Sequence, residues 1–515
     1  MTETHKVSSG APSTPGRMWE AINWTKHRRH VDQLQARIAK AVKEQRWGRV
    51  QALQHLLVSS YSARVLAVKK VTSNKGKNTP GIDGLVWRSA RLKLQAVDTL
   101  KRKGYRAQPL RRVMIPKSKD KKRALGIPTM KDRAMQALYA MALGPIAETL
   151  ADPHSYGFRP KRSTLDAIHQ CRTVLSRSHS ATWVLEGDIK ACFDQIDHQW
   201  MLDNIPMDKV ILRQWLEAGY IDKHVFHETE RGTPQGGIAS PILANMVLDG
   251  LQEAIAKAVP RGSKVNFIRY ADDFICTAAD PQILENTIKP VIQAFLAERG
   301  LQLSEEKTRI TRIEDGFDFL GFNIRKYGKG EKKTLLIQPA KEKVKLFYRK
   351  AKGCIQALRY KPTHEVITTL NRQFQGWANY YRSCNAKKTF SRLDHIFFQA
   401  IWRELRRRHP MKPGKWIKEK YFTSLGFNHW ILFGRERKTG KERYHYLFQF
   451  GRCKINRHVK VVSKKTFFDA DHKAYFKKRD AIKLAKRPRN RQETKSIWRP
   501  FVKGQLELFP AGLRK

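Results

Sequence analysis

Apolar residues in the N-terminal part of the chain recur every three or four positions, which is the spacing of an amphipathic helix. The first run is Val31, Leu34, Ile38 and Val42, and the second is Val50, Leu53 and Leu57. The sequence therefore predicts two helices that separate near Trp47-Gly48. Residues 73–84 are rich in Gly, Asn and Pro and carry lysines, which predicts a loop that either contacts phosphate or is a solvated connection.

From about residue 105 to residue 330, strand and helix patterns alternate. Residues 113–115 and 183–185 are apolar and rich in β-branched or aromatic side chains, so each predicts a strand. Thr129 is placed to cap a helix that continues through Met135, Leu138 and Ala142. This alternation predicts an α/β core.

Beyond residue 340 the helical spacing returns and predicts a separate helical module. Its apolar positions are Val344, Phe347, Ala351, Ile355 and Leu358, then Ile367, Leu370, Phe374, Trp377 and Tyr381. The period shortens to two at residues 430–433 and 444–450, with a hairpin turn predicted at 438–440. A basic tail ends the chain and contains Lys477, Lys478, Arg479, Lys486, Arg487, Arg489 and Arg491.

Charge narrows the class of protein. The chain has 515 residues and a net charge of +55, so it needs a polyanionic partner, and its 41% hydrophobic content argues against a disordered basic arm. Residues 341–515 carry 46 basic and 12 acidic residues, a net charge of +34, and form the stronger phosphate-binding part. These counts predict a folded nucleic-acid-binding protein.

The six cysteines include no CxxC pair, so neither a zinc site nor a disulfide framework is expected. The N-terminus has no apolar signal core, and no run of about 18 apolar residues occurs. We therefore expect a soluble protein in the cytoplasm.

Two adjacent carboxylates, Asp272 and Asp273, lie between two short apolar segments at residues 267–270 and 274–277. These segments predict two strands joined by a tight acidic turn. Carboxylates on rigid strands suit Mg²⁺, although a solvated Asp-Asp turn is the commoner outcome. A two-metal site needs a further carboxylate, and Asp188, at the end of the strand predicted from Trp183, is the candidate; its alternative role is to cap a helix.

Several motifs resemble those of reverse transcriptases and occur in the same order. Three are similar to palm motifs: Asp188 with Phe193, residues 231–237 (Arg-Gly-Thr-Pro-Gln-Gly-Gly) with Ser240-Pro241, and residues 270–273 (Tyr-Ala-Asp-Asp). Residues 125–129 with Asp132-Arg133, and residues 155–160 (Ser-Tyr-Gly-Phe-Arg-Pro), are similar to finger motifs of the group II intron-encoded branch. Residues 299–308 and 319–322 resemble its later palm motifs, and residues 375–381 and 406–410 with Trp416 and Tyr421-Phe422 resemble its maturase, or thumb, domain. The chain is identified as a member of the group II intron-encoded reverse transcriptase and maturase family.

The resemblance implies an α/β (α+β) right-hand polymerase. The expected division is a flexible N-terminus (1–17), an N-terminal extension with the start of the fingers (18–104), a fingers and palm domain (105–335), a helical thumb or maturase domain (336–425), and a basic C-terminal region that binds nucleic acid (426–515).

The resemblance also implies roles for individual residues. Asp188, Asp272 and Asp273 would be the catalytic residues and would hold two Mg²⁺ ions, for which Mn²⁺ can substitute. Lys117, Arg123, Phe193, Gln235 and Lys307 would bind the nucleotide, with Phe193 as the gate against a ribose 2′-OH and Lys307 as a proton donor to pyrophosphate. The alternatives are a solvated basic loop for Lys117 and Arg123 and a buried palm side chain for Phe193.

Template and RNA contacts are expected at Arg159, Arg372 and Arg382, with a structural arginine as the alternative at Arg159. Most aromatic residues near Arg372 are expected to pack in the core. The expected partners are a group II intron RNA, a DNA target with its primer strand and deoxynucleoside triphosphates, and no membrane is expected. The sequence is compatible with both a monomer and a dimer.

The predicted function is an RNA-directed DNA polymerase that binds group II intron RNA, assists its splicing and copies it into cDNA. The alternatives are a splicing cofactor with a vestigial polymerase and a reverse transcriptase recruited to another role such as defence. Many relatives carry a C-terminal HNH endonuclease with paired cysteines, whereas only Cys453 lies in the last 130 residues, so DNA-strand cleavage is not expected. The primer would then come from elsewhere, for instance a nascent strand at a replication fork.

Overall fold

The computed structural model describes residues 15–116, 122–223, 225–233, 236–328, 333–426, 428–438 and 441–485. The chain forms two compact units. Unit 1 contains residues 1–312 and 460–478, and unit 2 contains residues 313–459 and 479–515. In the described residues, no helix is long and apolar enough to cross a membrane.

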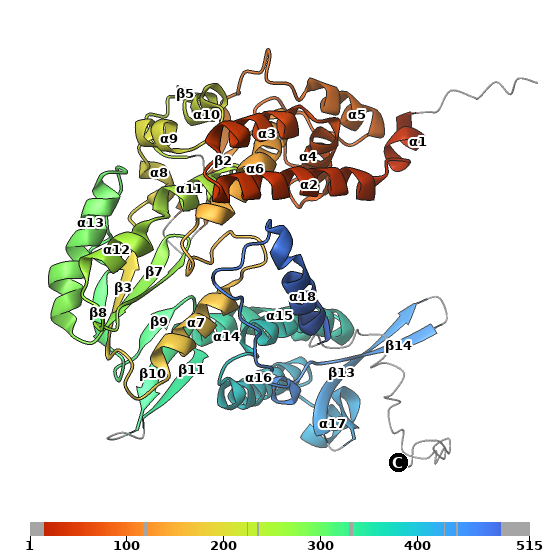
Figure 1. Ribbon diagram of the computed structural model, residues 1–515. Helices are drawn as coiled ribbons and strands as arrows, with labels where there is room; N and C mark the ends of the chain where they lie inside the picture. The colour runs from red at the N-terminus through yellow and green to blue at the C-terminus, as the bar shows by residue number, and fades with distance from the viewer. Residues whose placement is uncertain are drawn as a thin grey trace, which may run out of the picture. The chain divides into compact units, whose positions relative to one another are not determined.

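The N-terminal half of unit 1 is helical (Figure 1). Its helices are α1 (Pro15–Glu20), α2 (Trp24–Lys43), α3 (Trp47–Ser59), α4 (Tyr61–Ser73), α5 (Ala90–Thr99) and α6 (Met130–Leu150). The two helices predicted from apolar spacing are confirmed as α2 and α3, and their predicted apolar positions are buried. The Thr129 hydroxyl accepts a hydrogen bond from the backbone N–H of Asp132, which confirms it as the cap of α6. Arg133 donates to the carbonyls of Gly76 and Thr79, so α6 also holds the loop after α4.

A four-stranded antiparallel sheet, which we call the palm sheet, is the second part of unit 1. Its strands run in the order β6-β7-β3-β8. They are β3 (Trp183–Asp188), β6 (Asn266–Tyr270), β7 (Asp273–Ala278) and β8 (Arg309–Arg312). Val184 and Leu185 of β3 and residues 274–278 of β7 are consecutive and buried, as expected for central strands covered on both faces. Helices α12 (Leu251–Ala258) and α13 (Lys289–Ala297) lie beside this sheet (Figure 1).

A second sheet has the order β2-β1-β4-β5. It contains β1 (Leu110–Pro116), β2 (Lys122–Ile127), β4 (Tyr220–Asp222) and β5 (Val225–His227), so the strand predicted at 113–115 is confirmed. The remaining elements of unit 1 are α7 (Thr164–Leu175), α8 (Cys192–Gln195), α9 (His198–Asn204), α10 (Lys209–Leu216), α11 (Ser240–Leu248), the π-helix η1 (Ile283–Ile288) and the short helix η4 (Ala470–His472). Helix α18 (Lys473–Ala485) follows η4.

Unit 2 begins with a three-stranded sheet of β9 (Phe317–Phe319), β10 (Phe322–Tyr327) and β11 (Thr334–Pro339). The predicted helical module follows as α14 (Lys341–Gln356), η2 (Ala357–Arg359), α15 (Thr363–Tyr381), α16 (Lys387–Arg408) and α17 (Gly414–Tyr421). A second three-stranded sheet contains β12 (Phe422–Leu425), β13 (Asn428–Lys438) and β14 (Lys441–Tyr446), and η3 (Phe450–Arg452) comes after it. Strands β13 and β14 confirm the predicted hairpin.

The aromatic residues of unit 2 form its core, as expected. Phe347 stacks on Trp377 with ring centroids 4.8 Å apart, and Phe374 stacks on Phe397 at 4.6 Å. Phe374 and Tyr381 are buried, and the Tyr381 hydroxyl donates to the carbonyl of Gly321. These rings join α14, α15 and α16, so the helical spacing read from the sequence is a packing pattern.

Candidate active site

Strand register brings the predicted carboxylates together at one end of the palm sheet. Strands β3 and β7 pair so that Asp188 lies opposite Asp273. Strands β6 and β7 pair so that Tyr270 also lies opposite Asp273, which confirms the predicted hairpin with Ala271 and Asp272 as its two-residue turn. Asp188 does not cap a helix, because α8 begins at Cys192 with Ala191 at its N-cap. Three carboxylates therefore come from three adjacent strands or turns on a rigid support.

The charges of these groups are not balanced. The Lys307 ammonium donates to Oδ2 of Asp188 at 2.5 Å, and this hydrogen bond raises the pKa of Lys307. Desolvation and the negative charges of Asp272 and Asp188 raise the pKa of Asp273 to about 7. Closely spaced carboxylates resist losing their last proton, and a divalent cation is the usual way to relieve that repulsion.

A cleft of about 910 Å³ opens over the carboxylates. It brings together five of the predicted site residues: Arg123, Asp188, Phe193, Asp272 and Lys307. They come from β2, β3, α8, the β6–β7 turn and the segment before β8, so parts of the chain separated by nearly 200 residues meet at one place. A cleft of this size is within the range of small-molecule and cofactor sites.

The donor set fits Mg²⁺ in chemistry, because Mg²⁺ takes hard oxygen ligands and usually keeps several waters. Asp188 and Asp273 lie within hydrogen-bonding reach of each other, and Lys307 already places a cation on Asp188. In the part of the chain that the structure describes, no group of three His, Cys, Asp or Glu side chains is arranged to hold a metal ion as it stands. Metal binding would therefore require these carboxylates to turn on a fixed backbone.

Phe193 lies at the edge of the same cleft. Its side chain is half-buried, and its ring contacts the ring of Phe158 edge to face, with centroids 6.4 Å apart. The backbone N–H of Thr233 donates to the carbonyl of Phe193 at 2.6 Å, and Gly232 packs against the backbone of Asp194. Both readings of Phe193, a gate and a packed palm residue, are compatible with this position.

Arg159 is buried and its guanidinium is fully engaged inside the protein. It bonds both oxygens of Glu148, at 2.8 and 2.9 Å, and the carbonyls of Asp152 and Ser155. Every guanidinium nitrogen has a partner within the protein and the side chain is only 4% exposed, so little of it is accessible to a template phosphate. The structure therefore favours the structural alternative for Arg159.

The other predicted residues lie elsewhere. Lys117 and Gln235 fall outside the described residues. Arg372 and Arg382 belong to unit 2, where Arg372 lies exposed on α15 and Arg382 is half-buried at its end, with its carbonyl accepting from the backbone N–H of Asn456.

Buried ion pairs behind the carboxylate turn were not predicted from the sequence. Arg269, fully buried on β6, bonds Asp249 at 2.5 Å and Asn245 at 3.2 Å. Burial raises the pKa of Asp249 to about 6, partly opposed by the charge of Arg269. The only sequence signal for this ion pair was an arginine within a strand next to the carboxylate turn. The apolar periodicity of that strand does not predict a partner for the arginine.

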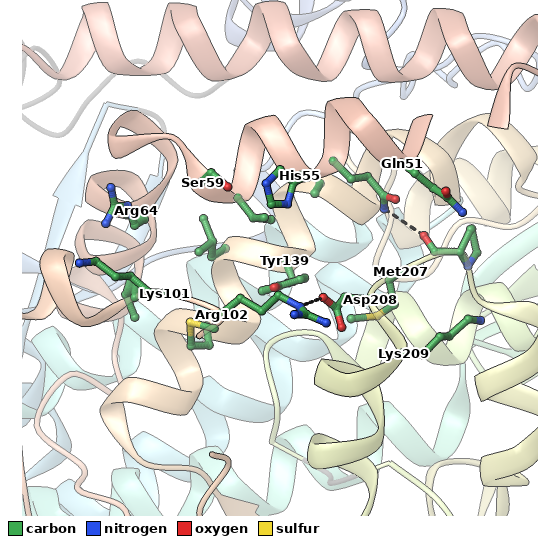
Figure 2. Close-up of a pocket in the computed structure, with 17 residues that line it drawn as sticks. Gln51, His55, Ser59, Arg64, Lys101, Arg102, Tyr139, Met207, Asp208 and Lys209 are labelled. Atoms are coloured by element: carbon green, nitrogen blue, oxygen red, sulfur yellow. Dashed lines mark hydrogen bonds and ion pairs between the residues drawn. The ribbon is translucent and has the colours of Figure 1, made fainter. Parts of the chain in front are cut away.

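A second cavity, of about 510 Å³, lies between α3, α6 and residues 206–209 (Figure 2). Its floor is apolar, and its rim holds basic side chains, among them Arg102 in an ion pair with Asp208. It shares no lining residue with the cleft over the carboxylates. This cavity is therefore separate from the cleft over the carboxylates.

Comparison with known proteins identifies the family. Residues 115–324 match the reverse transcriptase (RNA-dependent DNA polymerase) family, residues 19–100 match the N-terminal domain of reverse transcriptase, and residues 344–422 match the group II intron maturase-specific domain. The group II intron-encoded protein LtrA of Lactococcus lactis subsp. cremoris is 29% identical over 485 residues, covering 76% of this chain and 79% of LtrA. Protein YkfC of Escherichia coli (strain K12) is 32% identical over 303 residues, covering 50% of this chain and 79% of YkfC.

Among solved structures, telomerase from Candida albicans in complex with a fragment of telomeric RNA aligns with a TM-score of 0.35 and 11% identity, over 61% of this chain and 64% of that chain. A likeness this weak supports no conclusion.

The chain belongs to the group II intron-encoded reverse transcriptase and maturase family. This confirms the resemblance found in the motifs and the right-hand polymerase fold that it implies. The predicted function, that of a group II intron reverse transcriptase and maturase, is confirmed at the level of these domains.

Proposed function

We propose that this chain is an active RNA-directed DNA polymerase whose metal centre is formed by Asp188, Asp272 and Asp273. The observation that carries the proposal is the strand register that places Asp188 opposite Asp273, beside the Ala271-Asp272 turn. Sheet hydrogen bonds fix this arrangement before any ligand binds, and preorganised charge is what a phosphoryl-transfer site needs.

Bound Mg²⁺ ions in such a site activate the primer 3′-hydroxyl and neutralise the charge of the triphosphate. Asp188 and Asp272 would hold both ions, and Asp273 would support the first. The ammonium of Lys307 donates to the carboxylate of Asp188, which is one of the groups that would hold the metal. Lys307 would face the phosphates in the cleft, where its ammonium could donate a proton to the departing pyrophosphate.

Arg123 and Phe193 give the cleft its selectivity in this proposal. Arg123 is exposed on β2 at the cleft and suits a triphosphate, because a guanidinium pairs well with phosphate oxygens. Phe193 presents an aromatic ring where a ribose 2′-OH would lie, which favours deoxynucleotides. Lys117, expected near Arg123, and Gln235 would complete the nucleotide contacts.

Unit 2 would bind the group II intron RNA and assist its splicing. Its maturase-specific domain and the charge of +34 over residues 341–515, most of which belong to unit 2, support this assignment. Arg372 and Arg382 would contact phosphates, while the aromatic core holds α14, α15 and α16 together. We also propose that the chain acts on a DNA target with its primer strand, in the cytoplasm at the nucleoid. The five regions expected from the sequence are part of the same proposal.

A splicing cofactor with a vestigial polymerase is the second candidate, because the maturase-specific domain alone would serve it. Asp188, Asp272, Lys307 and Arg123 all line one open cleft, and Asp273 lies opposite Asp188, which supports the active enzyme instead. A vestigial site has no need to keep this set.

The test is extension of a DNA primer on an RNA template with deoxynucleoside triphosphates and Mg²⁺. The double variant Asp272→Ala/Asp273→Ala should lose extension by about 10²- to 10³-fold or more, while its affinity for intron RNA stays unchanged. Asp98→Asn, an exposed carboxylate on α5, is the matched control and should extend like wild type. If wild type itself does not extend, the cofactor function replaces the polymerase.

A further inference from the structure

Residues 155–158, which we name the platform segment, lie beside the strand that leads into the carboxylate turn. Ser155 forms a parallel bridge with Arg269 of β6. The N–H of Tyr156 donates to the carbonyl of Arg269 at 2.9 Å, and the N–H of Arg269 donates to the carbonyl of His154 at 3.0 Å. The platform segment thus adds a short edge to the palm sheet and ends at the Ala271-Asp272 turn.

Gly157 touches the backbone of that turn. A Cβ atom at this position would lie 2.4 Å from the backbone nitrogen of Ala271 and 3.0 Å from the carbonyl carbon of Tyr270. Gly157 does not have a left-handed backbone, so its conformation alone would accept an alanine. Glycine is therefore required for the close approach of two backbones, and the atom it approaches is two residues from Asp273.

The platform segment is held on its other side as well. The side-chain amide of Asn245, on α11, donates to the carbonyl of Gly157 at 2.8 Å. Arg159 donates to the carbonyl of Ser155 at 2.9 Å and is itself fixed by Glu148 of α6. The turn, in contrast, has solvent beyond Asp273. An atom added at Gly157 would therefore press on the buried backbone of Ala271, and the turn and the segment would have to move apart.

Phe158 is the next residue, and its backbone is left-handed at φ +58°. This conformation is rare for a bulky side chain and is kept mainly where function requires it. The residue is 55% exposed, so burial does not explain this backbone conformation. Its contact is the edge-to-face pair with Phe193, at an interplanar angle of 82°.

We propose that the platform segment positions both halves of the polymerase centre. Gly157 allows the close backbone contact that fixes the position of the turn carrying Asp272. Phe158 fixes the orientation of the Phe193 ring. The inference rests on the proposed polymerase function. Gly157 and Phe158 are positioning residues, because each acts through another group.

The first test compares Gly157→Ala with Gly48→Ala in the full-length chain. A Cβ atom at Gly48, on α3, meets nothing within 4 Å, so Gly48→Ala is the matched control. At Gly157 the contact must open from 2.4 Å to an ordinary 3.4 Å, a shift of about 1 Å. A misplacement of about 1 Å in a catalytic group can lower a rate about 10²-fold.

We expect Gly157→Ala to lower kcat about 100-fold and to raise the Mg²⁺ concentration needed for half-maximal rate, with nucleotide KM and RNA affinity within about threefold of wild type. A kcat and Mg²⁺ dependence equal to those of Gly48→Ala overturn the inference. An inactive wild type refutes the polymerase function instead, so the two failures are distinguishable.

Phe158 supplies an independent test that does not depend on core packing. Phe158→Leu should lower discrimination against ribonucleotides by about 2- to 10-fold, the worth of one aromatic pair, and Phe158→Tyr should restore it. The kcat/KM for deoxynucleotides is measured in both variants, so that a change in discrimination is separated from a general loss of activity. Unchanged discrimination in Phe158→Leu overturns this half of the inference. If Gly157→Ala fails to fold, the inference is reduced to the role of Phe158, which these variants decide.

Discussion

Arg269→Met removes the only charge that directly pairs with Asp249 in the described part of the structure, and its effect on stability can be worked out from the geometry. Arg269 is fully buried, and its guanidinium bonds Asp249 at 2.5 Å. Breaking a buried pair by removing one partner costs about 3–5 kcal/mol, because the remaining charge stays buried without compensation. Methionine fills much of the same volume, so the loss reports mainly on charge.

The loss should depend on pH, and its sign follows from the pKa of Asp249. Burial raises that pKa to about 6 even with Arg269 present, so the protonated carboxyl is favoured in the folded state. The contribution of Asp249 to the free energy of unfolding is fully present below the unfolded-state pKa of about 3.9. It is lost as pH rises through the folded-state pKa of about 6. Without Arg269 the folded pKa rises further, so the variant should be most destabilised above pH 7 and should approach wild type as pH falls toward 5.

The assay is urea unfolding of wild type, Arg269→Met and Arg261→Met at pH 8 and pH 5. Arg261 is exposed in the turn before β6 and serves as the matched control. Arg269→Met should lose about 3–5 kcal/mol at pH 8 and clearly less at pH 5, while Arg261→Met stays within about 0.5 kcal/mol of wild type. A loss below about 1 kcal/mol at pH 8, or an equal loss at both pH values, would refute the reasoning.

Three further outcomes follow from the same contacts. Phe193→Val should raise the ratio of ribonucleotide to deoxynucleotide kcat/KM in primer extension, and an unaltered ratio would assign the gate to another residue. Burial and the positive charges of Lys460 and Arg162 lower the pKa of His154 to about 4, so its contribution of up to about 3 kcal/mol is present above pH 6.5 and lost as pH falls through 4. His154→Gln should therefore flatten the fall in unfolding free energy between pH 6.5 and pH 4; an unchanged pH profile would contradict that origin. Arg372→Glu with Arg382→Glu should weaken intron RNA binding and reduce the slope of log affinity against log salt by about 1 per lost contact, and an unchanged slope would remove both residues from the interface.

Elements with one apolar face could be predicted from the sequence. Helices α2 and α3 keep a polar side, so their apolar positions stand out at helical spacing. The β6–β7 hairpin was equally clear, because two apolar strands flank a pair of carboxylates. Helix α4 shows no such contrast, since Ala63, Val65, Ala67 and Val68 are buried on several sides.

The carboxylate set could be named from sequence motifs, but its arrangement could not. Register is set by long-range pairing, so no local pattern predicts that Asp188 lies opposite Asp273. The role of Gly157 depends on the bridge between residues 155 and 269, which are far apart in sequence. For Arg159 the motif predicted a template contact, but the structure shows an ion pair with Glu148. That pair depends on how α6 packs, which the motif does not contain.

The central claim is that a carboxylate from β3 and the carboxylates of the β6–β7 turn act as one metal centre. The most direct measurement is the rate of Mg²⁺-dependent cDNA synthesis on an RNA template by Asp188→Asn, compared with wild type and Asp98→Asn at equal RNA affinity. The account predicts a loss of about 10²-fold or more for Asp188→Asn and no loss for Asp98→Asn. Synthesis by Asp188→Asn at the wild-type rate would contradict it.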